Sequence, residues 1–469
     1  MLLRQLFTAL LIPILGVAAY ATNCNEVQKG NEIDTTYLKR SIVTENAIIG
    51  IDYTPNGRYL ISGGSSKTVD IWNATTGKLL GSMEGHTDDV LAVACSPKGT
   101  IVASGGVDKK IILWSTITRE KIISLEGHND YVRDLSFSPN GKLLASASWD
   151  RTAIIWDVST GKRLQTLSGH QDNVTSVDFN DDGTQVVTAC GDHQLRVWNI
   201  ETGELLKTLR GHTDEIWDVK WSHNSRFIAS GAWDNKARVW DYHTGQEQFS
   251  FPGHVTDVWS VAFDPNGLVL ATSGGDKTVK LWDLATGELI LNVSQDIHNS
   301  DVEEVKFSPD GKTLASASRD GSIRLWKVPN LEERIDILAQ KAVDKWSVKE
   351  PFEKTAQYEK RMKEKEDYRE EIVAGVVSKV LRYFEDNVEW DENFELGEYD
   401  ADREYFVLNT PSLGRLRLMA SNSQAPMILD NFDRLVFKDL NLKYSKGYLY
   451  VDSMTAFMKG LNRRYSVSQ

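Results

Sequence analysis

Short runs of alternating hydrophobic and polar residues, separated by turn-forming residues, fill the middle of the chain. Residues 132–137 begin one such unit with apolar side chains at Val132, Leu135 and Phe137, and Pro139-Asn140-Gly141 then turns the chain. The same alternation predicts three further strands over 143–145, 153–156 and 163–167. Four short antiparallel strands joined by tight turns form one small twisted sheet, so the unit is expected to be all-β.

This unit recurs with a fixed period. Tryptophans follow one another at intervals of 42 residues, and the last follows after 44: Trp72, Trp114, Trp156, Trp198, Trp240, Trp282 and Trp326. Histidines keep the same interval from position 86 onward. A period between about 20 and 50 residues indicates a repeat architecture, in which each unit buries its apolar face against its neighbours.

Within one period, Gly127-His128, Phe137–Gly141, Trp156-Asp157 and Thr160-Gly161 are nearly constant. These marks resemble the WD-repeat β-propeller family, and the resemblance covers residues 36–328. It implies an all-β seven-bladed β-propeller, followed by a smaller α+β domain in the rest of the chain. The seventh unit has three strands and ends at Trp326-Lys327-Val328. An open sheet edge is a liability, so we expect the strand-like segment 37–42 to close blade 7, as is common in this family.

Each unit from the second onward holds a His, a Ser or Thr, an Asp and a Trp at constant spacing. A buried Trp N–H needs an acceptor, and a hydroxyl that accepts it can bond His, whose other nitrogen reaches Asp. Six copies of a hydrolytic site have no purpose, so we interpret the sets as structural clamps. Their members are His86, Ser104, Asp108, Trp114; His128, Ser146, Asp150, Trp156; His170, Thr188, Asp192, Trp198; His212, Ser230, Asp234, Trp240; His254, Thr272, Asp276, Trp282; and His298, Ser316, Asp320, Trp326.

The first unit departs from this pattern. Ser62 and Trp72 are present, but Ser66 replaces the Asp and no Gly-His precedes the unit. We therefore expect blade 1 to be the softest blade. The chain lacks His-Glu-x-x-His, paired Cys-x-x-Cys and Gly-x-Ser-x-Gly motifs. We expect neither a metal nor a cofactor, and no catalytic residues.

In WD-repeat proteins, partner contacts cluster on the upper face, beside the first-strand valine and just before the clamp Asp. Carrying these offsets to the present sequence selects Tyr131, Arg133, Trp149, Trp217, Trp233, Trp259 and Arg319. Aromatic residues and Arg are the usual anchors of interfaces. The neighbouring acids Glu215, Asp257, Asp301 and Glu303 favour a basic protein or peptide partner. The alternative is that these aromatic side chains only help the blades to pack.

After Asn330 the periodicity becomes helical. We predict a helix over Leu331–Trp346 and a second one over Phe352–Phe384, which form a connector over 329–390. Residues 352–359 resemble a helix start in exported proteins of Bacteroidota-type bacteria. A small β-rich module over 391–469 follows, with strands predicted at Leu396–Leu408, Leu413–Ala420, Asp433–Tyr444 and Gly447–Asp452.

The first residues form a separate signal. Arg4, the apolar run 6–19 and the small residues Ala19 and Ala21 predict a secretory signal peptide over 1–21, followed by a linker over 22–35. Export to the periplasm or the cell exterior, without a membrane span after cleavage, is therefore expected. Lipidation of Cys24 is the less favoured alternative, because Asn23 precedes it.

Charge and cysteine content narrow the classes of function. The net charge of −13 argues against a nucleic-acid-binding surface. Cys95 and Cys190 stand at positions of small residues, which favours packed thiols over a disulfide.

Together these features predict an exported, non-enzymatic scaffold that binds a protein or peptide on the upper face. The alternative is a carboxylate-based hydrolase or an envelope glycan-binding protein with its site in the C-terminal module, where residues 331–469 contain no His or Cys. The pattern does not predict an oligomeric state.

Overall fold

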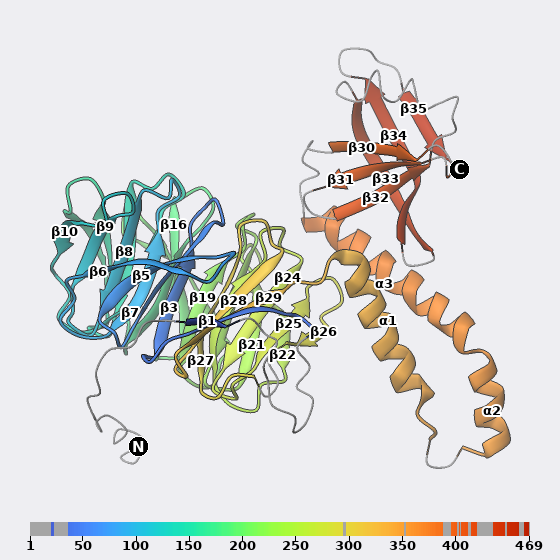
Figure 1. The fold of residues 1–469 in the computed structure, drawn as a ribbon, viewed down its shortest axis with the longest axis horizontal. Coiled ribbons are helices and arrows are strands. Elements are labelled where there is room, and N and C mark those ends of the chain that lie inside the picture. The colour runs from blue at the N-terminus through green and yellow to red at the C-terminus, as the bar shows by residue number, and fades with distance from the viewer. Residues whose placement is uncertain are drawn as a thin grey trace.

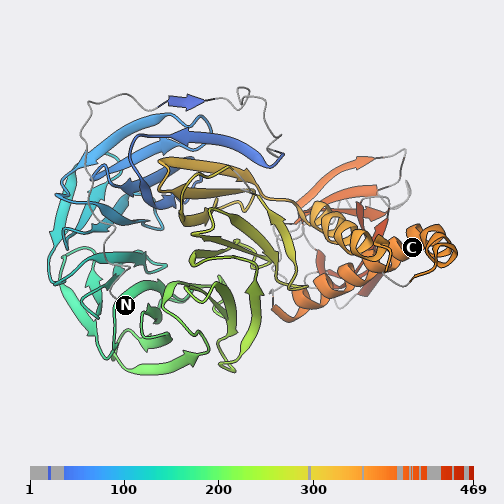
Figure 2. The ribbon, with the colours of Figure 1, turned by 90° about the horizontal axis from the view of Figure 1, so that it is seen from below.

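The computed structural model describes residues 20–22, 36–293, 297–350 and 353–387, and in the C-terminal module 395–400, 403, 405–410, 414–419, 435–445, 448–458 and 464–468. Seven antiparallel sheets stand around a central channel like the blades of a propeller (Figure 2). The strands of blades 1 to 3 are β3 (Ile48–Tyr53), β4 (Tyr59–Gly64), β5 (Thr68–Asn73), β6 (Leu79–Glu84); β7 (Val90–Cys95), β8 (Ile101–Gly106), β9 (Ile111–Ser115), β10 (Lys121–Leu125); β11 (Val132–Phe137), β12 (Leu143–Ser148), β13 (Ala153–Asp157) and β14 (Arg163–Leu167).

Blades 4 to 7 repeat the arrangement, with the first strand of each blade innermost. Their strands are β15 (Val174–Phe179), β16 (Gln185–Cys190), β17 (Gln194–Asn199), β18 (Leu205–Arg210); β19 (Ile216–Trp221), β20 (Phe227–Ala232), β21 (Lys236–Asp241), β22 (Glu247–Pro252); β23 (Val258–Phe263), β24 (Val269–Gly274), β25 (Val279–Asp283), β26 (Leu289–Asn292); β27 (Val302–Phe307), β28 (Thr313–Ser318) and β29 (Ser322–Lys327). This is the seven-bladed all-β architecture that the sequence predicts.

The ring is closed by a strand from the other end of the chain. β2 (Leu38–Val43) pairs antiparallel with β29, from Leu38 opposite Trp326 to Val43 opposite Ser322. Its span begins and ends one residue later than the segment 37–42. A short strand, β1 (Tyr20–Thr22), pairs with the other edge of β2, so the predicted cleavage point after Ala21 falls within β1. The rest of the predicted signal peptide and the linker residues 23–35 lie outside the described residues.

The repeated turns explain why blades have the same shape. In blade 3 the Asn140 side chain accepts hydrogen bonds from the Ser138 hydroxyl and the Lys142 N–H, each at 2.9 Å. Gly141 follows with φ of 69°, which glycine adopts without strain. Blade 5 replaces this glycine by Ser225, which adopts φ of 54° in the equivalent turn. The turn is thus fixed by the Asn side chain, even where glycine is absent.

Three helices follow the last blade. α1 (Leu331–Ser347) starts with a capping box between Asn330 and Glu333. The prediction of one continuous helix over Phe352–Phe384 is wrong, because α2 (Thr355–Lys363) ends at Glu364 and α3 (Lys365–Asn387) starts there. Arg361 near the end of α2 pairs with Glu353 at 2.7 Å and donates to the Val348 carbonyl, which holds α2 folded back against the end of α1.

The C-terminal module contains one mixed sheet, seen above the helices in Figure 1. Its strands are β30 (Glu395–Asp400), β31 (Tyr405–Thr410), β32 (Gly414–Met419), β33 (Leu435–Ser445), β34 (Tyr448–Met458) and β35 (Arg464–Ser468). The single strand predicted over Leu396–Leu408 is wrong: the chain turns back there, with Arg403 N–H donating to Asp400, and Leu396 lies opposite Leu408. The sequence analysis also missed β35.

The helices and the propeller share one apolar core. Buried side chains of blades 6 and 7 form a continuous cluster with Ile335 of α1, Val377 of α3 and Phe406 of β31. Arg334, buried on α1, lies 3.7 Å from Asp283 in blade 6, and the Tyr383 hydroxyl donates to the Gly267 carbonyl at 3.0 Å. The described residues contain no helix that is both long and apolar enough to cross a bilayer.

Candidate functional site

The clamp is fully formed in blade 3. Trp156 Nε1 donates to Ser146 Oγ at 2.8 Å, and His128 Nε2 lies 2.7 Å from the same oxygen. His128 Nδ1 lies 2.9 Å from Asp150. Blades 2, 5, 6 and 7 contain the same chain of bonds, in which blade 6 uses Thr272 as the hydroxyl. Ser146 is fully buried, so no substrate reaches its oxygen and the set acts as a packing element.

The same bonds stabilise the ionised Asp. Burial alone would raise the pKa of Asp150, but hydrogen bonds from His128 and Thr152 outweigh burial and hold its pKa well below the ordinary range. In blade 5 the corresponding balance lowers the pKa of Asp234 to about 2. A carboxylate that accepts several hydrogen bonds at a turn ties the turn to the loop that carries His. The clamp therefore fastens the upper ends of blades 2, 3, 5, 6 and 7.

Blade 4 breaks the expected pattern. His170 Nε2 lies 2.9 Å from Thr188, but His170 Nδ1 is buried and has no hydrogen-bond partner among the residues that the structure describes. Asp192 instead accepts two hydrogen bonds from Arg196, at 3.0 and 2.7 Å. Blade 3 has Ile154 at the position of Arg196, where no charge competes for the carboxylate. Burial and the charge of Arg196 lower the pKa of His170 to about 4, so this imidazole is neutral at pH 7. The predicted four-residue clamp is wrong for blade 4.

Blade 1 keeps only part of the clamp. Trp72 Nε1 donates to Ser62 at 2.8 Å, as in the other blades. Ser66 lies 2.9 Å from Thr68, which donates to Asp70 at 3.1 Å. Burial raises the pKa of Asp70. In blade 1, hydrogen bonds among Ser66, Thr68 and Asp70 thus occupy the place where the neighbouring blades 2 and 7 have the His–Asp contact.

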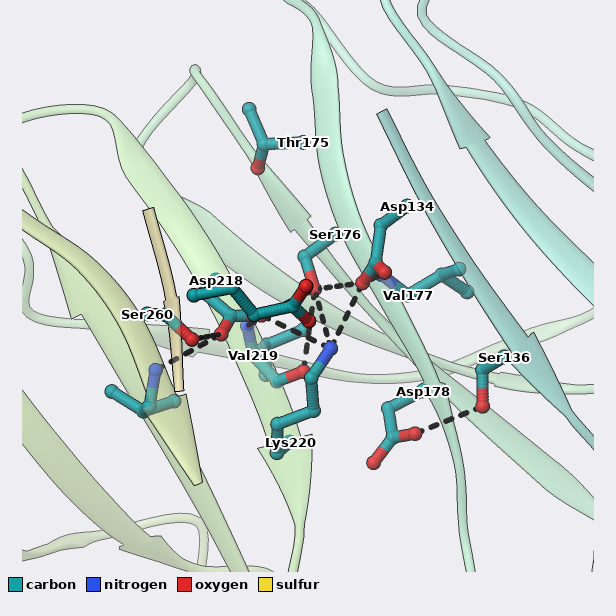
Figure 3. Close-up of polar contacts among 12 residues, drawn as sticks. Asp134, Ser136, Thr175, Ser176, Val177, Asp178, Asp218, Val219, Lys220 and Ser260 are labelled. Carbon is teal, nitrogen blue, oxygen red and sulfur yellow. Dashed lines mark hydrogen bonds and ion pairs between the residues drawn. The ribbon is translucent and has the colours of Figure 1, made fainter. Parts of the chain in front are cut away.

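Polar side chains on the innermost strands join neighbouring blades (Figure 3). Asp134 of blade 3 accepts from Val177 N–H of blade 4, and Asp218 of blade 5 accepts from Val261 N–H of blade 6. Asp52, Asp178 and Glu304 make the corresponding contact with the first strand of the following blade. A buried backbone N–H must find an acceptor. These carboxylates therefore join five of the seven pairs of neighbouring blades at the inner edge of the ring and are structural.

Two lysines compensate the carboxylates within the channel. Lys220 lies 2.9 Å from Asp134 and 3.1 Å from Asp218, and Lys306 lies 3.2 Å from Glu304. Burial alone would raise the pKa of Asp218, but Lys220 outweighs burial and lowers it to about 2. Burial raises the pKa of Glu304 to about 7, even with Lys306 beside it. Below the lysines the channel widens to a cavity of about 380 Å³ at the lower face.

The seven residues selected on the upper face come together in one cluster, which we call the rim cluster. Trp217 stacks on Trp233 with ring centroids 5.2 Å apart and meets Trp259 edge-on at 4.7 Å. Trp149 contacts Trp217 at 6.4 Å and Tyr131 at 5.0 Å, which extends the aromatic surface to blade 3. Backbone bonds from Trp149 to Tyr131 and from Trp233 to Glu215 hold the two loops of each blade together.

Two arginines of the rim cluster lie over these rings. The Arg133 guanidinium is 5.1 Å from the Trp217 centroid, and that of Arg319 is 5.9 Å from the Trp259 centroid. Both also pair with Glu303, Arg133 at 3.4 Å. Glu303 is only 2 % exposed. The expectation that Glu303 flanks the surface for a basic partner is therefore wrong, because the protein's own arginines already occupy this carboxylate.

The indole N–H groups of the rim cluster are unsatisfied. Nε1 of Trp149, Trp217, Trp233 and Trp259 is buried, and none has a hydrogen-bond partner in the described part of the chain. Trp217 is 9 % exposed and lies at the centre of the cluster. An unpaired buried donor typically costs about 1–3 kcal/mol. Four unpaired donors therefore make an unfavourable contribution to the folding free energy at one place, the upper mouth of the channel.

The potential metal ligands and the cysteines do not lie together to form a site in the described part of the chain. Within the described ranges no three His, Cys, Asp or Glu side chains lie close enough to hold a metal ion. Cys95 and Cys190 are free thiols, and burial raises the pKa of Cys190 to about 12.

Sequence reasoning missed the inter-blade carboxylates and Arg196. A signal for the carboxylates was present, since polar residues occupy alternate positions of the first strands, such as Asp134 and Ser136 or Asp218 and Lys220. On an inner strand the side facing the channel is polar, so this alternation marks the channel lining. Arg196 offered no distinguishing signal, because blades 5, 6 and 7 also have a cation at this position, namely Arg238, Lys280 and Arg324.

Comparison with protein-family models gives two matches. Residues 174–348 match the IFT122 first beta-propeller, and residues 48–218 match the Echinoderm microtubule-associated protein second beta-propeller. Each match covers less than half of the chain, and together they extend over all the blades. A search of curated proteins found no match.

The ring is a WD-repeat-like β-propeller. Propeller families of this kind generally mediate protein interactions. In the WD-repeat-like ring, surfaces such as the rim cluster are therefore the candidate interaction sites. The clamps and the channel carboxylates hold the blades in position.

Proposed function

We propose that the protein is a non-enzymatic scaffold that binds a protein or peptide through the rim cluster. The supporting observation is the continuous surface of four Trp, one Tyr and two Arg around the upper mouth of the channel. Large aromatic side chains and Arg dominate the binding energy of interfaces. The buried serines of the clamps support a non-enzymatic role, since they are closed to substrate.

The unsatisfied indole N–H groups indicate what the partner supplies. A peptide backbone carries carbonyl acceptors along its whole length. A shift of the half-buried Trp233 and Trp259 side chains would expose their Nε1 atoms to these acceptors and remove the cost of leaving them unpaired. Because Arg133 and Arg319 lie on the ring faces and neutralise Glu303, an extended backbone fits this surface better than a cluster of basic side chains.

The test is a double substitution, Trp233→Ala with Trp259→Ala. Both side chains are less buried than Trp217, whose removal would take away the centre of the cluster. Loss of two hot-spot side chains at about 2 kcal/mol each weakens binding by roughly 10³-fold. The control is Tyr242→Ala, which removes an aromatic side chain that packs on Trp221 at the other end of β19.

Circular dichroism verifies folding, and quantitative affinity capture scores the partners of the three proteins. The proposal expects the double variant to lose partners that the control retains. A double variant that captures the same partners as the intact protein, at equal yield, contradicts it.

We also propose that the protein acts outside the cytoplasm. This rests on the basic residue, apolar run and small residues within positions 1–21. Mass spectrometry of protein purified from a bacterial host tests it: the expected mature N-terminus is Thr22, and a lipid adduct on Cys24 would identify the alternative. A chain that keeps Met1 through fractionation contradicts the proposal.

A further inference from the structure

A second hollow lies far from the rim cluster, at the junction where the ring closes. A cavity of about 610 Å³ opens between blades 7 and 1. Its lining joins the closing strand β2, the end of β3 and the turn after β27: Lys39, Arg40, Tyr53, Pro55, Pro309 and Leu325. Small-molecule sites typically have volumes of about 300–1,000 Å³, with apolar walls and few polar groups. The volume of this cavity falls within that range, and its lining is mixed, with polar side chains beside an apolar strip of Pro55, Pro309 and Leu325.

Two cations line this cavity without forming a salt bridge to any described residue, and one carboxylate, that of Asp310, lines it as well. Lys39 Nζ donates to the Lys312 carbonyl at 3.1 Å and to Thr313 at 2.6 Å, and Arg40 donates to the Thr76 carbonyl at 3.0 Å. Within the described part of the chain, neither forms an ion pair. Burial and the nearby Lys327 and Lys312 lower the pKa of Lys39, although Asp310 acts in the opposite direction. An otherwise acidic protein thus concentrates positive charge here.

The third feature is an unpaired hydroxyl. Tyr53 is 6 % exposed, and its Oη is buried with no hydrogen-bond partner among the described residues. The equivalent first-strand positions of blades 3, 4, 6 and 7 have Phe, and that of blade 5 has Trp. A phenol at this site costs free energy unless something accepts its proton. Lys39 retains one N–H and Arg40 retains four for the same acceptor.

We propose that the cavity between blades 7 and 1 binds a small organic anion with an apolar body. Its carboxylate or phosphate group bonds Lys39, Arg40 and the Tyr53 hydroxyl, and its apolar part lies along Pro55, Ala74, Pro309 and Leu325. Arg and Lys recognise both anionic groups through charge-assisted hydrogen bonds. This site is independent of the rim cluster and of any protein partner bound there.

The probe is 1-anilinonaphthalene-8-sulfonate, an organic anion that fluoresces when bound, titrated into the full-length chain. Lys39→Gln is expected to weaken its binding at least about tenfold, and Tyr53→Phe several-fold, because each removes one donor to the anion. Tyr53→Phe should also raise the melting temperature without ligand, since it removes an unpaired buried group. The matched control is Lys207→Gln, since Lys207 bonds carbonyl oxygens of Tyr242 and His243 in a similar manner on blade 4.

A filling variant separates this site from nonspecific adsorption. Thr75→Trp places a large side chain in the cavity, leaves both cations in place and should abolish binding. Displacement of the probe by octanoate or by phenyl phosphate then distinguishes a carboxylate ligand from a phosphate ligand. The proposal is overturned if Lys39→Gln and Tyr53→Phe bind the probe like the intact protein, or if Thr75→Trp retains binding. Circular dichroism confirms that each variant is folded.

Discussion

Blades 3 and 4 are neighbours with the same strands and turns, yet their upper ends are fastened differently. In blade 3 the carboxylate of Asp150 meets His128, whereas in blade 4 the carboxylate of Asp192 turns to Arg196 and leaves His170 with one nitrogen unpaired among the described residues. The third strand of blade 4 has Arg196 where blade 3 has Ile154, and Asp192 pairs with this arginine. A cation alone does not break the clamp, because blades 5, 6 and 7 have Arg238, Lys280 and Arg324 at this position and keep the His–Asp contact. In blade 5 the guanidinium of Arg238 also pairs with Glu247. A repeated motif therefore specifies the backbone of a blade more firmly than it specifies its hydrogen bonds.

The largest effect is expected from Asp192→Ala in blade 4. It removes the carboxylate that pairs with Arg196, a residue that is itself 6 % exposed, and leaves this cation buried without an acidic partner in the described part of the chain. Breaking a buried ion pair by removing one partner typically costs about 3–5 kcal/mol. Chemical denaturation monitored by circular dichroism measures the loss. An unfolding free energy equal to that of the intact protein would show that Arg196 escapes to solvent.

Acid should destabilise blade 4 through His170. The pKa of His170 is about 4 in the folded protein, against about 6.5 in an unfolded chain, so the unfolded state binds more protons between these values. Stability is present above pH 6.5 and falls as the pH drops toward 4, by roughly 3 kcal/mol from this residue. Melting curves at pH 7 and 4.5 test this, with His170→Gln as the comparison. The variant should lose less stability over this interval, and an equal loss contradicts the assignment.

Asp150→Ala should cost less than Asp192→Ala. It leaves His128, Thr152 and the Asn129 N–H unpaired, but it leaves no buried arginine without its carboxylate. One unsatisfied buried group costs about 1–3 kcal/mol. Comparison of the two alanine variants in the same denaturation experiment measures the difference directly. A larger cost for Asp150→Ala would reverse the interpretation of the two blades.

The smallest effect is expected from Arg196→Ile, which gives blade 4 the residue of blade 3. It frees Asp192 to accept from His170, and the new hydrogen bond contributes about 1 kcal/mol. The His170 pKa should then rise, because the charge of Arg196 no longer lowers it. NMR titration of the imidazole measures this shift, and an unchanged pKa would mean that burial alone sets its value.

The sequence predicted the blades well because their determinants are local. The turn around Asn140 and the spacing of Ser146 and Trp156 carry the necessary hydrogen bonds within a few residues of each other. The rim cluster also followed from position, since residues at equal offsets in neighbouring repeats must lie side by side.

The errors arose where distant segments meet. The state of Glu303 depends on Arg133, 170 positions away. The break at Glu364 depends on contacts between α2 and the end of α1, which no helical periodicity displays. Likewise, the cavity at Tyr53 exists only because β2 joins blade 7 across the whole repeat array. Such features depend on tertiary structure, so one-dimensional patterns do not reveal them.

Closure of the ring has a consequence for the order of folding. Thr44, just after β2, bonds to Gly321, 277 positions later in the chain. During synthesis the closing strand emerges first, and its partner β29 emerges only after every other blade. Forming a contact between residues so far apart in sequence costs loop-closure entropy before the contact stabilises the fold. Such contacts therefore form slowly during folding. The last step of assembly must therefore join the two ends of the array, and until then β2 and β29 both expose edges on which a second nascent chain could pair.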